Sequence, residues 1–124
     1  MIIGIGIDIV QVKRMDRWLK NIPLLKRYFH AQELILASSR KNSEAQTLAA
    51  RFAAKEAFVK ALGTGFVKIA LKDIMVFNRE NGKPDIQLFG TAKKAFEESG
   101  ADKVHISLTH EKENAIAMIM LERV

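Results

Sequence analysis

The segment from Arg51 to Gly65, RFAAKEAFVKALGTG, constrains the fold of this chain more than any other part of the sequence. Alanine, a strong helix former, recurs along it, and two glycines close it at the kind of position where helices end. The run predicts the C-terminal part of a long helix that begins near Ser43. Ser43 and Gln46 have the spacing of a capping box. We expect this helix to be the central element on which the rest of the chain packs.

The predicted helix is apolar around nearly its whole circumference. Bulky side chains form one arc and alanines fill most of the opposite side, a pattern typical of a buried helix. The bulky arc comprises Leu48, Phe52, Val59 and Leu62. The helix nevertheless carries four charged residues, Arg51, Lys55, Glu56 and Lys60. Charges on a largely covered helix require partners or a ligand.

Glu56 and Lys60 lie four residues apart and therefore share one face of the helix. One interpretation is an ordinary surface ion pair, which contributes about 0.2–0.5 kcal/mol. The other is a functional pair, in which the carboxylate binds a metal ion and the ammonium binds a phosphate group. The functional interpretation requires a second acidic residue elsewhere in the chain.

Asp8 is the candidate for that second acid. It interrupts a β-branched run from Met1 to Val10 that predicts the first strand. Gly4 and Gly6 within this strand indicate close approach of another backbone or of a ligand. An aspartate in such a strand either accepts hydrogen bonds from a neighbouring loop or helix end, or binds a cation. Carboxylate oxygens suit Mg²⁺, which commonly takes one or two carboxylates together with substrate phosphates.

The other segments predict a single α+β domain spanning residues 1–124. The expected helices are Gln11–Leu19, with a basic outer face, Leu24–Phe29, a short helix from His30 or Ala31 to about Ala37, and Thr91–Ser99. The expected strands are Asp73–Asn78 and Asp85–Phe89, flanking Asn81-Gly82, and Val104–His110 and Ala115–Leu121, also joined as a hairpin. The last strand is apolar on both faces, so we expect it to be central or to lie in an interface.

Composition narrows the functional classes. The chain has no cysteine, which excludes disulfides, thiolate metal sites and a cysteine nucleophile, and fits a reducing compartment. No apolar run approaches the roughly 20 residues of a membrane helix, and the N-terminal segment contains Asp8 and lacks a basic leader. We therefore expect a cytoplasmic protein without membrane contact. The net charge of +6 favours anionic partners, which include nucleic acid, phosphorylated small molecules and acidic proteins.

Several motif classes are missing. There is no Walker pattern, the Gly4-Ile5-Gly6 segment lacks the third glycine of a dinucleotide fingerprint, and the histidines lack metalloprotease spacing. A small nucleic-acid-binding module without catalysis stays open as the alternative, supported by charge alone, because recognition motifs and stacking aromatics are sparse. The first strand is also similar to that of actin-like or nuclease-like folds. Those folds usually place a glycine soon after the aspartate, where this chain has Ile9 and Val10.

Three blocks of the sequence together resemble the signature of one enzyme family, holo-[acyl-carrier-protein] synthase, the small bacterial class of 4′-phosphopantetheinyl transferases. The blocks are GIGIDIV at Gly4–Val10, RFAAKEAFVKALGTG at Arg51–Gly65 and HISLTHEKENAIAMIML at His105–Leu121. They stand in the expected order, and the resemblance covers nearly the whole chain. The chain departs from the family pattern at His30, where threonine is commoner, and at Asn114, where an aromatic residue is often seen.

The resemblance implies a fold and a reaction. The fold would be 4′-phosphopantetheinyl transferase-like, an α+β domain with an antiparallel sheet of β-α3-β2 type around a long central helix. The reaction would transfer 4′-phosphopantetheine from coenzyme A to a serine of apo acyl carrier protein, in fatty acid biosynthesis. Adenosine 3′,5′-bisphosphate would be the other product. The resemblance also implies a homotrimer with active sites between subunits.

The same resemblance implies roles for individual residues. Asp8 and Glu56 are similar to the ligands of the cofactor Mg²⁺. Lys60 matches a lysine at the coenzyme A phosphates, and His110 a histidine in the same site. Phosphoryl-type transfer depends mainly on positioning and charge neutralisation, which these groups can supply. The base that accepts the serine proton stays open between Glu56, Asp8 acting through a metal-bound water, and His110.

The predicted binding residues contact either coenzyme A or the acyl carrier protein. The resemblance implies coenzyme A contacts for Arg51, Lys60, Gly63, Thr64, Gly65 and His110. Arg14 is similar to an arginine that docks the acyl carrier protein, and Arg17 lies on the same basic helix. A basic face suits an acidic carrier, chiefly by steering the encounter.

Overall fold

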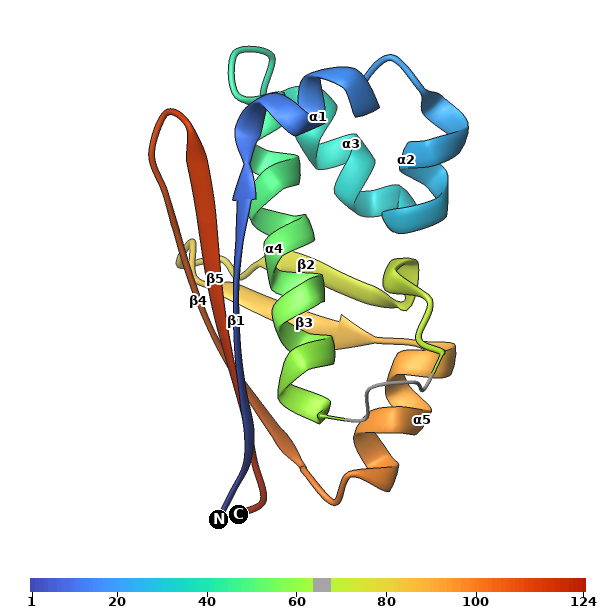
Figure 1. Cartoon of the computed structure of the whole chain (residues 1–124), viewed down its shortest axis with the longest axis vertical. Helices are drawn as coiled ribbons and strands as arrows, with labels where there is room; N and C mark the ends of the chain where they lie inside the picture. The colour runs from blue at the N-terminus through green and yellow to red at the C-terminus, as the bar shows by residue number, and fades with distance from the viewer. Residues whose placement is uncertain (64–67) are drawn as a thin grey trace.

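Helix α4 (Glu44–Leu62) lies in the middle of the molecule in the computed structural model, which describes residues 1–63 and 68–124 (Figure 1). Before it come β1 (Ile2–Gln11), α1 (Val12–Trp18), α2 (Ile22–Tyr28) and α3 (Ala31–Ser39). After it come the 3-10 turn η1 (Leu71–Asp73), β2 (Ile74–Asn78), β3 (Pro84–Leu88), α5 (Gly90–Glu98), β4 (Lys103–His110) and β5 (Asn114–Glu122). The prediction of a long central helix is confirmed.

The strands form two antiparallel sheets. One has the order β1-β5-β4, and the other is the β2–β3 hairpin, whose connection occupies residues 79–83. The three-stranded sheet runs along one side of α4, while α1, α2 and α3 gather around the upper part of the same helix (Figure 1). The predicted α+β class and both predicted hairpins are confirmed. β5 is the central strand of its sheet, as its two apolar faces indicated.

Two glycines bring β1 into direct backbone contact with α4. A Cβ atom at Gly4 would lie 1.9 Å from the carbonyl oxygen of Ala61, and one at Gly6 would lie 1.9 Å from that of Ala57. Any side chain at either position would therefore collide with the helix backbone. Side chains alternate along a strand, so Asp8 faces α4 as Gly4 and Gly6 do.

The N-terminus of α4 differs from the prediction. Ser43 occupies the cap position, but its side chain makes no capping hydrogen bond. Its backbone angles, φ −139° and ψ 25°, lie outside the extended conformation that normally turns a cap side chain toward the first helical amides. A capping box occurs instead at α3, where His30 Nδ1 accepts a hydrogen bond from Gln32 N and Glu33 Oε1 accepts one from His30 N.

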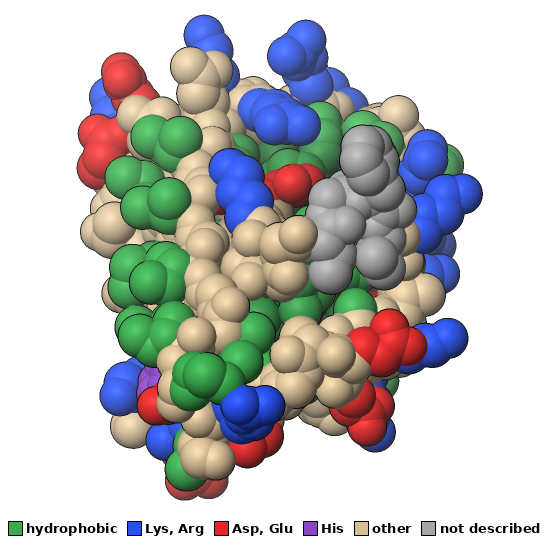
Figure 2. All heavy atoms as spheres, turned by 60° about the horizontal axis from the view of Figure 1, so that its bottom comes forward, with side chains coloured by type: hydrophobic (Ala, Val, Ile, Leu, Met, Phe, Trp, Pro, Cys, Tyr) green, Lys and Arg blue, Asp and Glu red, His purple; other side chains and the backbone are tan. Residues whose placement is uncertain are grey.

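The three-stranded sheet has one buried face and one exposed apolar face. Ala115, Ala117, Ile119 and Leu121 of β5 are fully buried toward α4. On the other face, the side chains of Ile7 and Met118, paired across β1 and β5, are 60% and 40% exposed. We call this surface the outer sheet face; it comprises Ile5, Ile7, Ile9, Ile116, Met118 and Met120. Figure 2 shows hydrophobic side chains exposed in a column along one side of the molecule.

Among residues 1–63 and 68–124, the model contains no helix with the length and apolar character needed to cross a bilayer.

Candidate active site

Asp8 and Lys60 meet where β1 packs against α4. Lys60 Nζ donates hydrogen bonds to Asp8 Oδ1 at 2.9 Å and to the carbonyl oxygen of Ile7 at 3.1 Å. The Asp8 side chain is mostly covered, whereas that of Lys60 is 55% exposed. The ammonium therefore pairs with the aspartate on the strand, and the simple Glu56–Lys60 surface pair is not the arrangement observed.

Glu56 lies half-buried beside this ion pair. Burial is the main cause that raises the pKa of Glu56 above the ordinary value, and the negative charge of Asp8 raises it further. Lys60 and Arg14 act in the opposite direction, because positive charge favours the ionised carboxylate. The structure thus brings together the two acids and the lysine that the sequence singled out.

The residues present fit a magnesium ion. Two carboxylates converge at one edge of α4, where the negative charge of Asp8 acts on Glu56. Within the described parts of the chain, no group of three or more histidine, cysteine, aspartate or glutamate side chains could hold a metal. A pair of carboxylates is nevertheless the donor set that Mg²⁺ accepts when substrate phosphates and water complete its coordination.

The titration of Glu56 gives a direct test of this geometry. In metal-free protein we expect its pKa to lie above the ordinary 4.5, to fall in Asp8→Asn and to rise in Lys60→Met. The pKa of Glu56 is higher in the folded state than in the unfolded state. The free energy of unfolding should therefore decrease as the pH rises from the unfolded-state pKa to the folded-state pKa. NMR of ¹³C-labelled glutamate carboxyls in EDTA measures these shifts. An unchanged Glu56 pKa in Asp8→Asn would contradict the proximity of the two acids.

The end of α4 borders the same region. Gly63, a predicted coenzyme A contact, caps the helix with φ 66°, a left-handed conformation that suits glycine, and a Cβ atom there would meet nothing within 4 Å among the described residues. Thr64 and Gly65, also predicted to contact coenzyme A, lie outside the described residues.

Arg51 and His110 are not in contact with the acidic pair in this chain. Arg51 is 3% exposed and donates from Nη2 to Asn78 Oδ1 at 2.6 Å, while its buried Nε has no hydrogen-bond partner among the described residues. His110 is exposed at the end of β4. Because β5 separates β4 from β1, His110 lies about 10 Å or more from Asp8 within one chain.

Arg14 of the predicted docking helix α1 packs on a cluster of aromatic side chains. The guanidinium carbon of Arg14 lies 5.0 Å from the ring centre of Trp18 and 5.1 Å from that of Phe52. Trp18 also stacks on Tyr28, with ring centres 5.3 Å apart. Cation–π contact holds Arg14 in one orientation, and Phe52 precedes Glu56 by one helical turn. Arg17 is exposed on the same helix.

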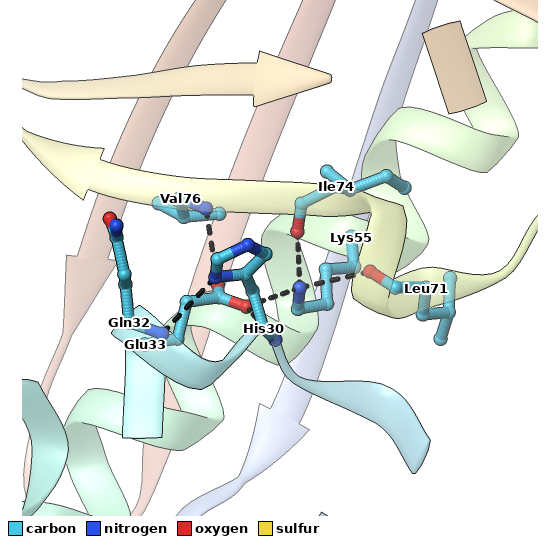
Figure 3. Close-up of polar contacts among 7 residues, drawn as sticks. All are labelled: His30, Gln32, Glu33, Lys55, Leu71, Ile74 and Val76. Carbon is cyan, nitrogen blue, oxygen red and sulfur yellow. Dashed lines mark hydrogen bonds and ion pairs between the residues drawn. The ribbon is translucent and has the colours of Figure 1, made fainter. Parts of the chain in front are cut away.

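The sequence did not predict the buried ion pair between Glu33 and Lys55. Lys55 Nζ lies 2.6 Å from Glu33 Oε1, and both side chains are completely buried (Figure 3). Burial lowers the pKa of Lys55, and the charge of Glu33 opposes that shift. The sequence signal for Lys55 was a lysine on an apolar helix, but nothing in the sequence identified Glu33 as its partner.

Comparison with known proteins agrees with the geometry. Residues 4–119 match the model of the 4′-phosphopantetheinyl transferase superfamily. Holo-[acyl-carrier-protein] synthase of Treponema denticola is 52% identical over 122 residues, covering 98% of this chain and 99% of that protein. The enzyme of the same name from Trichlorobacter lovleyi is 48% identical and covers 98% of each chain.

Solved structures show the same fold. The holo-[acyl-carrier-protein] synthase of Neisseria meningitidis superposes with a TM-score of 0.88 at 34% identity, covering 99% of this chain and 100% of that one. The synthase of Bacillus anthracis, solved in complex with CoA (3′,5′-ADP), gives a TM-score of 0.82 at 36% identity, covering 100% and 99% of the two chains. The chain therefore belongs to the holo-[acyl-carrier-protein] synthases of the 4′-phosphopantetheinyl transferase superfamily.

Proposed function

We propose that this protein transfers the 4′-phosphopantetheine group of coenzyme A to a serine of apo acyl carrier protein. The observation that carries the proposal is the convergence of Asp8, Glu56 and Lys60 at the contact of β1 with α4. Family membership supplies the reaction class. The alternative, a nucleic-acid-binding module, gains no support from the relatives described above.

The chemical step exchanges one phosphorus–oxygen bond for another. The serine oxygen forms a bond to the phosphorus that carries pantetheine, and the bond from that phosphorus to the bridging pyrophosphate oxygen breaks. The electron pair leaves on adenosine 3′,5′-bisphosphate. The serine proton passes to a base, for which this chain offers Glu56 and, through a water molecule, Asp8. Lys60 places fixed positive charge where negative charge develops.

Asp8 and Glu56 would hold Mg²⁺ in this proposal. A Mg²⁺ ion held there would supply positive charge to the phosphate groups of coenzyme A. Lys60 pairs with Asp8 and its side chain is more than half exposed, so it would be free to turn toward a phosphate group. Gly63 and Arg51 are the further coenzyme A contacts that we propose, together with Thr64 and Gly65.

We also propose a homotrimer with shared sites, which two features of the single chain support. The outer sheet face is apolar and exposed, which is unusual for a surface that stays in water. His110 is predicted to line the site but lies two strands from Asp8 in its own chain. Closed assembly would cover the outer sheet face in every subunit and could bring His110 to a neighbouring Asp8. We place this enzyme in the cytoplasm, in fatty acid biosynthesis, where acyl carrier protein is its substrate.

One assay tests the function directly. The protein is incubated with coenzyme A, Mg²⁺ and apo acyl carrier protein, and the intact mass of the carrier is then measured. We expect the carrier mass to increase by one phosphopantetheine group. A carrier that keeps its apo mass in the presence of folded protein would contradict the proposed reaction.

Arg14 provides a separate test of carrier docking. We expect Arg14→Glu to raise the KM for the carrier by more than about tenfold, because a steering charge becomes repulsive toward an acidic partner. The KM for coenzyme A should change little. Trp18 is the only tryptophan and touches Arg14, so its fluorescence reports carrier binding without turnover. Lys94→Glu, an equal charge change on exposed α5, is the control. Weakened coenzyme A binding with normal carrier binding would refute the docking role.

A further inference from the structure

The Glu33–Lys55 pair joins four elements at the side of α4 that faces away from β1. All three hydrogens of the Lys55 ammonium are used, by Glu33 Oε1 at 2.6 Å, the carbonyl oxygen of Leu71 at 3.0 Å and that of Ile74 (Figure 3). Glu33 in turn accepts hydrogen bonds from His30 N at 2.9 Å and Val76 N at 3.1 Å. Helices α3 and α4, turn η1 and strand β2 are thereby connected through one buried ammonium.

Fold stability alone does not account for a pair of this kind. Removing two charges from water is costly, and apolar side chains of similar volume often replace a buried ion pair without loss of stability. The pair instead constrains position, because an ammonium bound to three fixed acceptors allows only one rotation and register of the helix that carries it. The placement of α4 against β1 requires such a constraint.

The contact between α4 and β1 permits close approach but has few interlocking side chains. At Gly4 and Gly6 the strand offers bare backbone to Ala61 and Ala57 of the helix. A surface without side chains gives little resistance to sliding or rotation of the helix on the strand. With about 100° between successive helical residues, Lys55 lies roughly 200° from Ala57, on the opposite side of α4.

The positions of Glu56 and Lys60 relative to Asp8 depend on the rotation of α4 about its own axis. Glu56 follows Lys55 directly, about 100° around the helix, and Lys60 is one turn further along. Lys60 must reach Asp8 Oδ1, and Glu56 precedes Lys60 by one helical turn on the same face of α4. A rotation of α4 would move both side chains relative to Asp8.

We propose that Glu33 and Lys55 are positioning residues that fix the rotation and register of α4, so that Glu56 and Lys60 face Asp8. This inference deepens the proposed transfer reaction and rests on it for its kinetic part. Neither residue is required to touch substrate. The pair acts through helix α4, from the side of the helix opposite to the glycine contact.

The decisive variant replaces the whole pair, Glu33→Leu with Lys55→Met. We expect it to unfold within a few degrees of the wild-type temperature, because no charge is left unpaired. Its kcat should fall about 10²-fold, the loss that misplacement of reacting groups by about 1 Å can cause, while the KM for the carrier stays within about threefold. A crystal structure of this variant should show α4 turned so that Lys60 Nζ no longer reaches Asp8 Oδ1.

A matched control removes a surface pair. Arg79 and Asp85 form an ion pair of 2.5 Å on the β2–β3 hairpin, and Arg79→Gln with Asp85→Asn should leave kcat and the contact between Lys60 and Asp8 unchanged. Glu33→Gln, which keeps the shape of the side chain but removes its charge, is the second test variant. It should lose kcat in the same direction, with normal carrier KM.

The outcomes separate the two proposals. A stable double variant with normal kcat and an intact contact between Lys60 and Asp8 would overturn the positioning role. Unfolding of both the double variant and Glu33→Gln would also overturn it, because the pair would then serve the fold itself. If the double variant alone unfolds, the kcat of Glu33→Gln and its contact between Lys60 and Asp8 decide. Absence of transfer by the wild-type protein would count against the proposed function, while the structure of the variants would still test the positioning role.

Discussion

Asp8→Asn and Glu56→Gln should each reduce turnover by at least about 10²-fold while the fold is retained. Loss of a preorganised charge in the active site of an enzyme typically costs this much or more. Both substitutions preserve side-chain volume, and neither residue belongs to the buried apolar core. The rate of carrier modification, followed by intact mass, and the thermal unfolding temperature are the two measurements.

The metal dependence of the same variants makes the test specific. The wild-type protein should lose activity in EDTA and regain it with added Mg²⁺. Either single variant should need a higher Mg²⁺ concentration for its residual activity, because one of two carboxylate ligands is gone. Glu97→Gln, at an exposed position of α5, serves as the control and should behave as wild type. Near-normal transfer by either variant, with contaminating wild-type enzyme excluded, would refute a shared magnesium site.

Met118→Glu should convert the assembled protein into smaller species and reduce activity by more than about tenfold. Met118 lies at the middle of the outer sheet face, paired with Ile7 on one side and Ser107 on the other. In a closed trimer the new carboxylate would be buried in each subunit without a partner, at a cost of several kcal/mol. Light scattering at several protein concentrations measures the assembly, and the mass assay measures the activity.

A second exposed apolar residue provides the control for this experiment. Ile35 on α3 is 68% exposed, more than Met118, but lies on a helix away from the outer sheet face. Ile35→Glu should therefore leave assembly and activity unchanged. A fully active wild-type monomer would defeat the shared-site proposal. So would a Met118→Glu protein that stays trimeric and active.

The raised pKa of Glu56 bears on the interpretation of both kinetic experiments. Assays should be made well above the folded-state pKa, so that Glu56 is ionised in every variant compared. Lys60→Met is expected to raise that pKa further, since the nearby positive charge is removed. A comparison at a single acidic pH would mix loss of charge stabilisation with protonation of Glu56.

Much of the fold could be predicted because local patterns and tertiary packing agree. The alanine-rich run predicted α4, and the pattern of apolar residues predicted β4 and β5. Gly4 and Gly6 indicated close backbone approach, and the structure places the backbone of α4 there. Each of these signals depends on residues that are near one another in sequence.

The errors arose where the backbone conformation depends on distant contacts. Ser43 has the right chemistry for a cap, but its dihedral angles turn the side chain away from the first amides of α4. Likewise, Lys60 follows Glu56 by four residues, yet its ammonium binds Asp8 on a strand more than fifty residues earlier. Helical spacing identifies neighbours on one element, whereas the choice of ion-pair partner depends on which element packs beside it.

The sequence by itself determined the elements and the chemical character of Asp8, Glu56 and Lys60, because periodicity and residue type are local properties. Only the tertiary structure decided that Asp8 pairs with Lys60, that Arg51 is buried against Asn78, and that His110 stands apart from the acids in one chain. Only the tertiary structure joined Glu33 to Lys55. These contacts link residues far apart in sequence, and their distances follow from how α4 packs between its neighbours, which no local pattern specifies.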